Sequence, residues 1–124
     1  MSNTIRFTLL PGEVEIKKIE NTTVTQTAFL MYKILFAQDV IVTNKRVVVI
    51  NRYMPAFANC PFSIFYRESD YNSAKSFTSL LLQEVERGNS CTVLLCRGFW
   101  ILPGQKWKIK DLAIADIILK YKNS

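Results

Sequence analysis

Two aliphatic runs flank a short polar interruption in DVIVTNKRVVVINR, residues 39–52. The interruption consists of Thr43, Asn44, Lys45 and Arg46. It predicts a tight hairpin turn, in which Asn44 adopts the positive backbone angle that such turns need and Lys45 lies in solvent. The predicted register pairs Val40 with Val49, Ile41 with Val48, and Val42 with Val47. Both faces of this hairpin are apolar, so we expect each face to be covered by other parts of the chain or by a partner.

Similar patterns of aliphatic and aromatic residues recur along most of the chain and predict further strands. These strands are expected at residues 13–19, 29–36 (running on into the hairpin), 62–67, 77–86, 91–101 and 105–110. Glu68 and Asp70 lie between the strands expected at residues 62–67 and 77–86, and they indicate a solvated turn there.

Only the end of the chain has a helical pattern. In residues 111–122, apolar residues recur every three or four positions, and Asp111 is a plausible N-cap. Asp116 and Lys120 fall one turn apart on the polar side, where they can form an exposed ion pair. The order of elements predicts a mainly β fold of about seven antiparallel strands, closed at one end by the C-terminal helix.

This order resembles the bacterial pleckstrin-homology-like and GRAM-like domains. The resemblance rests on LLPGE at residues 9–13 and VTNKRVVVI at residues 42–50. The matching positions are Gly12, Glu13, Thr43, Asn44, Lys45 and Arg46. It implies a β sandwich or partly open barrel with a C-terminal α-helix, and we interpret Thr43 to Arg46 as a signature of that fold.

Members of these families bind phosphoinositides, other lipids, peptides or copies of themselves, so the fold alone does not name a ligand. The phosphoinositide-binding members carry basic residues around the loop that joins their first two strands. Here that loop is expected in ENTTVTQTAF, residues 20–29, which has no basic residue. The resemblance therefore implies no phosphoinositide pocket of the usual kind.

The last predicted hairpin carries the most suggestive chemistry. If Pro103 and Gly104 are its central turn residues, Trp100 lies opposite Trp107 on one face. The other face then carries a group that we call the basic strip: Arg97, Phe99, Lys106, Lys108 and Lys110. The strip is a candidate binding site for an anion or a partner, with Phe99 available for a cation–π contact or stacking. The alternative is an outer face on which lysines only provide solubility and discourage edge pairing.

Residues 51–62, NRYMPAFANCPF, are rich in apolar residues for a connection. They can dock on a partner or a membrane interface, or fold back over the core; the last is the simpler interpretation.

The 124 residues suffice for one domain with a single core, which we place at residues 1–124. The chain has no His, only four glycines and three scattered cysteines, so no catalytic triad, zinc site or phosphate-binding glycine loop is expected. Cys91 and Cys96 are expected to fill the core. We therefore predict a protein that is not an enzyme and has no cofactor or metal. The odd number of cysteines, which leaves one without a disulfide partner, and the lack of a signal-peptide pattern favour a cytoplasmic location.

The sequence carries 16 Lys and Arg against 10 Asp and Glu, a net charge of +6, which weakly favours an anionic partner. We predict a protein-binding domain whose partner is another protein or further copies of itself. The first alternative is peripheral binding of anionic lipid head groups through the basic strip. Nucleic acid comes third, because aromatic residues for base stacking are not arrayed beside the strip.

Overall fold

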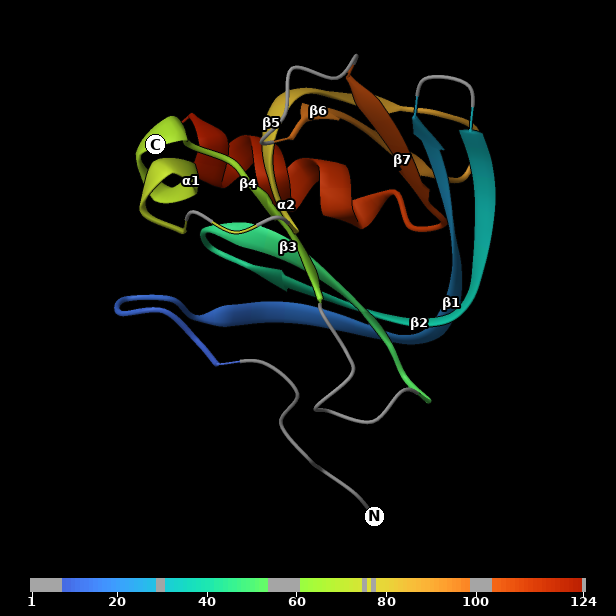
Figure 1. The fold of residues 1–124 in the computed structure, drawn as a ribbon, viewed down its shortest axis with the longest axis horizontal. Coiled ribbons are helices and arrows are strands. Elements are labelled where there is room, and N and C mark those ends of the chain that lie inside the picture. Colours follow the sequence, from blue (N-terminus) through green and yellow to red (C-terminus); the bar gives the residue numbers. More distant parts are fainter. Residues whose placement is uncertain are drawn as a thin grey trace.

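Strand pairing in sequence order builds a barrel. The computed structural model describes residues 8–28, 31–53, 61–74, 76, 78–98 and 104–123. Within these residues, seven strands follow one another around the barrel, and the first pairs with the last to close it (Figure 1). The strands are β1 (Glu15–Ala28), β2 (Met31–Thr43), β3 (Arg46–Asn51), β4 (Phe62–Phe65), β5 (Ser79–Arg87), β6 (Thr92–Arg97) and β7 (Gln105–Ile109). Two helices, α1 (Glu68–Ala74) and α2 (Ala113–Lys122), complete the fold. The predicted mainly β fold with a C-terminal helix is confirmed.

One strand pair departs from the antiparallel arrangement. β4 and β5 run parallel, with Ile64 opposite Leu80, because helix α1 carries the chain back between them. The solvated turn predicted at Glu68 and Asp70 was therefore wrong. Both carboxylates lie in the first turn of α1, where the positive end of the helix dipole favours them.

The loop predicted at residues 20–29 was also wrong, because β1 continues to Ala28. Its second half alternates threonines with inward-facing residues, and β-branched threonine suits a strand. Val24 is fully buried in the barrel, whereas Thr25 and Thr27 are partly exposed on the outside. The polar character of both faces hid this strand from a hydrophobic pattern.

The long strands β1 and β2 bend together at one corner. The register shifts there, between Ile19 and Thr22 and again between Thr22 and Val24. Asn21 and Ala37 both adopt positive φ, of 53° and 57°. The bend lets the first half of β1 pair only with β2, whereas its second half also pairs with β7.

The predicted hairpin at residues 39–52 is confirmed, with the register deduced from its alternation. One face looks into the barrel, where Val40, Val42, Val47 and Val49 join the main core. The other face holds a second, smaller buried cluster, which consists of Ile41, Val48 and Ile50. Both faces are covered, as the two-sided apolar pattern predicted.

Helix α2 packs against the barrel through Ile114, Ala115 and Ile118, which are buried. The N-cap predicted at Asp111 was wrong, because Leu112 occupies that position without a side-chain hydrogen bond. Asp111 instead forms an ion pair with Lys17 of β1, over 2.9 Å. This ion pair ties the connection before the helix to the first strand.

On the other side of α2, Asp116 pairs with Arg87 of β5. The predicted exposed pair with Lys120 does not form, and the Lys120 amino group lies 5.5 Å from the Tyr121 ring centroid.

The predicted pairing of Trp100 with Trp107 was wrong. Trp107 pairs with Leu94 across β6 and β7, and its side chain is fully buried beside Phe62, with ring centroids 5.1 Å apart. Trp100 and Pro103 lie outside the described residues. The observed register differs from the predicted one by six residues, an even number, so the faces assigned to the β7 residues are unchanged.

Replacement of Ala37 by Gly should stabilise the protein. A non-glycine residue in the left-handed region destabilises the folded protein by about 1–2 kcal/mol. Glycine removes this strain, but it also makes the unfolded chain more flexible, which offsets part of the gain. We expect Ala37→Gly to raise the free energy of unfolding by about 1 kcal/mol, measured by urea denaturation. The control Ala115→Gly, inside α2, should lower it by at least about 1 kcal/mol. Equal destabilisation by both variants would show that the corner carries no such strain.

Candidate functional site

The motif residues that resemble pleckstrin-homology-like domains converge on one buried ion pair. Arg46 binds Glu13 through two hydrogen bonds, Nε to Oε2 at 2.8 Å and Nη2 to Oε1 at 3.1 Å. The two residues are only 8% and 6% exposed. Arg46 also donates to the Ser63 hydroxyl at 3.0 Å and to the Thr8 carbonyl at 2.9 Å. Its guanidinium is therefore committed to contacts within the chain.

Thr43 and Asn44 complete this network, which we call the anchor. The Thr43 hydroxyl donates to Glu13 Oε2 at 2.6 Å. Asn44 accepts a hydrogen bond from the Val14 amide at 2.8 Å and donates to the Gly12 carbonyl at 3.1 Å. Asn44 was predicted to adopt a positive φ, but it is not among the described residues that do so. That prediction was wrong. Its side chain serves instead to join the turn to the segment before β1.

Lys45 is also engaged, although it was expected in solvent. Its amino group lies 3.9 Å from Asp70 of α1, and its carbonyl accepts a hydrogen bond from the Tyr66 amide at 3.1 Å. All four turn residues thus bind other parts of the chain. The anchor joins the β2–β3 turn to the segment before β1.

Hydrogen bonding controls the protonation of Glu13. Burial raises the pKa of this carboxyl, but hydrogen bonds from Arg46, Thr43 and the Leu10 amide, with the charge of Arg46, outweigh it. The net result is a pKa below the ordinary value.

The basic strip is a row of charges along one hairpin. Lys106 and Lys108 project from the outer face of β7, and Lys110 follows the end of that strand. Arg97 ends β6, and its guanidinium lies 5.9 Å from the Tyr71 ring centroid. Phe99 lies outside the described residues. Since Thr92 faces Ile109, Arg97 and Lys110 stand at opposite ends of the hairpin, about 20 Å apart at 3.3 Å per residue. The four cations do not converge.

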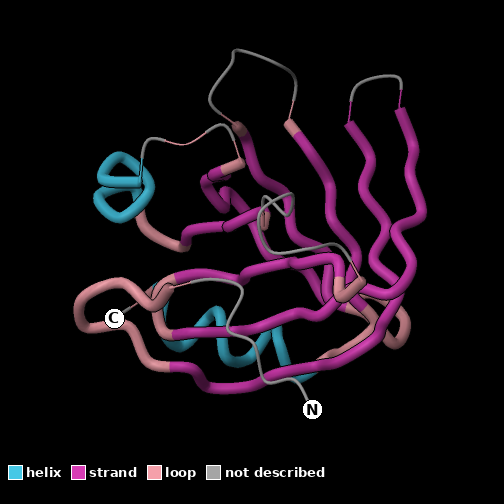
Figure 2. The backbone as a smooth tube through the Cα atoms, turned by 60° about the horizontal axis from the view of Figure 1, so that its bottom comes forward, coloured by secondary structure: helices cyan, strands magenta, loops and turns pink. Residues whose placement is uncertain are grey.

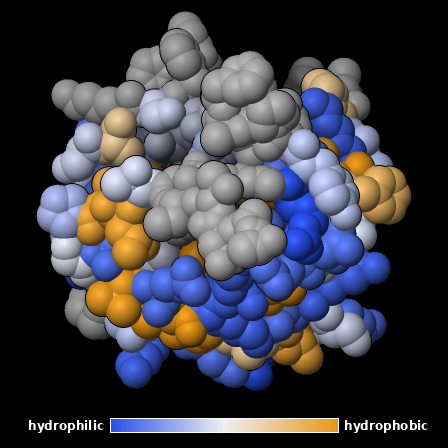
Figure 3. All heavy atoms as spheres, turned by 90° about the horizontal axis from the view of Figure 1, so that it is seen from below, coloured by the Kyte–Doolittle hydropathy of each residue, from blue (hydrophilic) through white to orange (hydrophobic). Residues whose placement is uncertain are grey.

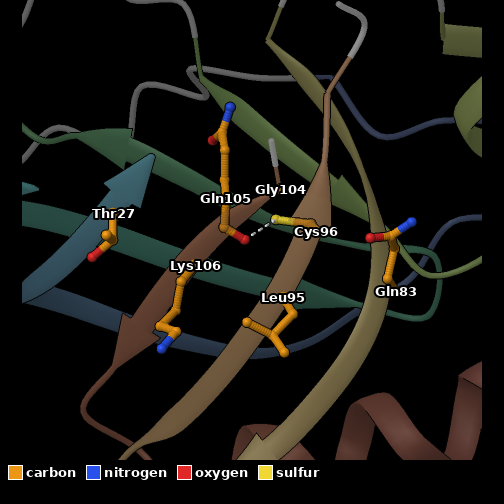
Figure 4. A pocket seen from close by; sticks show the side chains of 7 residues that line it. All are labelled: Thr27, Gln83, Leu95, Cys96, Gly104, Gln105 and Lys106. Atoms are coloured by element: carbon orange, nitrogen blue, oxygen red, sulfur yellow. Dashed lines mark hydrogen bonds between the residues drawn. The ribbon is translucent and has the colours of Figure 1, made fainter. Parts of the chain in front are cut away.

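A shallow pocket of about 470 Å³ lies beside Lys106, across the strands β1, β7, β6 and β5 (Figure 4). Its lining consists of Thr27, Gln83, Leu95, Cys96, Gly104, Gln105 and Lys106. Burial raises the pKa of the Cys96 thiol to about 12, so its thiolate is scarce at neutral pH. The described residues contain no group of three or more His, Cys, Asp or Glu side chains that could hold a metal ion.

A different surface emerges at β2. Residues 31–35 of this strand pair with β1, but pairing with β3 begins only at Gln38. We call residues 31–36 the free edge, because no other described strand pairs with them on the side away from β1; the carbonyl of Ala37 already accepts a hydrogen bond from the Arg52 amide at 2.9 Å. In Figures 1 and 2 this half of the hairpin forms the right margin of the molecule, with β2 as its outer strand. Every second residue of such an edge directs its backbone N–H and C=O groups away from its partner.

The free edge carries four large exposed apolar side chains. They are Met31 (55% exposed), Tyr32 (65%), Ile34 (49%) and Phe36 (68%). A bulge places both Phe36 and Ala37 opposite Thr23, since Thr22 faces Gln38 and Val24 faces Leu35. This surface was missed because the run FLMYKILF indicated only a strand with two apolar faces. Nothing in the local pattern says that β3 is too short to cover it.

Polar residues border this apolar surface. Across the strands, Tyr32 faces Thr27, which faces Lys106; Ile34 faces Thr25, which faces Lys108. Viewed from below, the molecule shows many hydrophilic residues across its lower part, and apolar residues in several separate places (Figure 3). Of the ten large apolar side chains that are exposed among the described residues, four lie together in residues 31–36 of β2.

The chain matches no protein-family model, no curated protein and no solved structure. Among the described residues, no helix combines the length and the apolar character needed to cross a bilayer.

The buried pair predicts a loss of stability in acid. Because the folded pKa of Glu13 is lowered from its ordinary value, the contribution of the pair is complete above that ordinary value and is lost as the pH falls through the folded pKa. Denaturant unfolding between pH 7 and pH 3 should show this loss. Glu13→Gln should lower the free energy of unfolding by about 3 kcal/mol at pH 7 and flatten its pH dependence. Glu84→Gln, which changes an exposed carboxylate, is the matched control; an equal flattening there would contradict the assignment.

Proposed function

We propose that this protein is a non-enzymatic binding domain whose partner is a protein, bound along the free edge of β2. The observation that carries the proposal is the coincidence of four exposed apolar side chains with a strand edge that no other described strand covers. Adding a strand to such an edge supplies main-chain hydrogen bonds for affinity, and contacts with alternate side chains supply specificity. On this proposal, the pleckstrin-homology-like resemblance describes a scaffold used for protein recognition.

Energetics support a protein partner. Complete burial of a large apolar side chain contributes about 1.5–3 kcal/mol, and each of the four is about half to two-thirds exposed. Natural proteins usually protect open edges with charges or prolines. Here Lys33 is the one charged residue among residues 31–36, and no proline occurs there. An apolar edge with so little protection is typical of an interaction surface.

The charges favour a protein over an anionic bilayer. Lys106 and Lys108 share their outer face with Glu84 and Glu86, which lie two strands away on β5, about 10 Å distant. Arg97 and Lys110 lie too far apart to join them around one head group. The outer face around Lys106 and Lys108 therefore has mixed charge, whereas the free edge has four exposed apolar side chains close together.

Photo-crosslinking in cells that contain the protein tests this proposal. Benzoylphenylalanine in place of Phe36 should give covalent adducts with protein, because a partner strand would cover that position. Benzoylphenylalanine in place of Leu119, an exposed apolar residue of α2, is the control. We expect at least a fivefold excess of protein adducts at position 36, measured by mass spectrometry.

Circular dichroism should first show that both labelled proteins are folded. Equal adducts at positions 36 and 119 would overturn the proposal. Adducts at position 36 with lipid in place of protein would also overturn it, in favour of the membrane alternative.

A further inference from the structure

We propose that the partner is a second copy of this chain, and that two free edges pair antiparallel about a two-fold axis at Ile34. This inference rests on the proposed function and names the occupant of the same edge. The result is one continuous sheet that runs from β7 and β1 through β2 of one copy into β2, β1 and β7 of the other. Such an interface is isologous, since each copy contributes the same surface.

The ends of the free edge limit the register. It has six residues, bounded at one end by the tip of the β1–β2 hairpin and at the other by Ala37, whose carbonyl accepts a hydrogen bond from the Arg52 amide at 2.9 Å. An axis at Ile34 pairs residues 32–36 of one copy with the same residues of the second copy and requires no pairing at Ala37. A closed pair then leaves no open edge on this side, which prevents growth into a filament.

The side chains agree with this register. On the outer face, Tyr32 lies opposite Phe36 of the second copy, and Ile34 lies opposite its own equivalent. Such aromatic and β-branched cross-strand pairs are favourable. Centring the pair on Lys33 instead would place two lysines directly opposite each other, whereas the axis at Ile34 places Lys33 opposite Leu35 of the second copy. The edge is thus complementary to itself.

The wider charge distribution agrees as well. Each copy carries +6, but Lys106 and Lys108 lie two strands away from the edge, behind Thr25 and Thr27. Five strand spacings would separate β7 of the two copies, about 24 Å, compared with a Debye length of about 8 Å at physiological salt. The arrangement has an apolar centre and a polar rim, as in other protein interfaces. A partner chosen by charge would have only Lys33 to recognise within the edge.

Cysteine cross-linking tests the register directly. Cys60 and Cys91 are first replaced by Ser, and the buried Cys96 is retained. Under mild oxidation, Ile34→Cys should form a disulfide-linked dimer, because directly opposite strand residues have Cα atoms about 4.5–5.5 Å apart, within disulfide reach. Tyr32→Cys alone should cross-link at least tenfold less, as should Phe36→Cys alone. An equal mixture of the last two variants should cross-link efficiently.

Light scattering supplies the second readout. The unmodified chain should approach twice its 14.3 kDa mass as concentration rises. Ile34→Lys, which brings two lysines together on the axis, should weaken dimerisation at least tenfold. Val14→Lys, at an exposed apolar residue before β1, should not, and circular dichroism should show both variants folded.

The outcomes separate this inference from the proposed function. A monomer at all concentrations, with no cross-link at position 34, overturns the inference; foreign-protein adducts at position 36 would then leave the proposed function standing. Strong cross-linking by Tyr32→Cys alone overturns the register. Absence of both protein adducts and cross-links overturns the inference and the proposed function together.

Discussion

The architecture depends on a mismatch in strand length. β1 and β2 have 14 and 13 residues, whereas β3 has six and β7 has five. Short neighbours cannot pair with the long hairpin along its whole length. The hairpin therefore bends at Asn21 and Ala37 and serves both sides of the barrel in turn. Among the described residues, the free edge of β2 follows from this geometry, because β3 pairs only as far as Gln38 and the Arg52 amide reaches only the Ala37 carbonyl.

The two ends of the long hairpin have opposite characters. At the end near the β2–β3 turn, the anchor joins Glu13 to Arg46 and satisfies the polar groups of the turn. Buried ion pairs of this kind contribute little net stability, since desolvation offsets the attraction, but loss of one partner is strongly destabilising. The anchor therefore specifies where the hairpin starts and how it is oriented. At the other end, the described residues Met31, Tyr32 and Ile34 of β2 leave large apolar side chains exposed.

The sequence correctly predicted the elements whose hydrophobic pattern depends only on residues close together in the chain. The hairpin at residues 39–52 was predicted with its register, because its two apolar faces and polar turn leave one consistent alignment. The second half of β1 was missed, since its threonines give no hydrophobic alternation, and α1 was missed because seven residues are too few for a clear helical period. Asp111 was expected to cap α2, but its pairing with Lys17 depends on a strand some 90 residues earlier.

The candidate surface shows the same limit. Alternation correctly placed Lys106 and Lys108 on the outside of β7, but could not show that Arg97 and Lys110 lie at opposite ends of the hairpin. The apolar run in β2 was recognised as a strand, and its exposure could be known only once the lengths of its neighbours were known. The pairing of strands that lie far apart in the sequence decides which apolar residues remain exposed for a partner. Local propensity does not.

Backbone hydrogen exchange at different protein concentrations tests most directly whether a second copy of the chain covers the free edge of β2. In dilute protein, amides of residues 31–36 that point away from β1 should exchange quickly, whereas those of residues 40–42, which pair on both sides, should exchange slowly. At high concentration, the free edge should become as protected as residues 40–42. Protection of residues 31–36 that stays the same at every concentration would contradict the account.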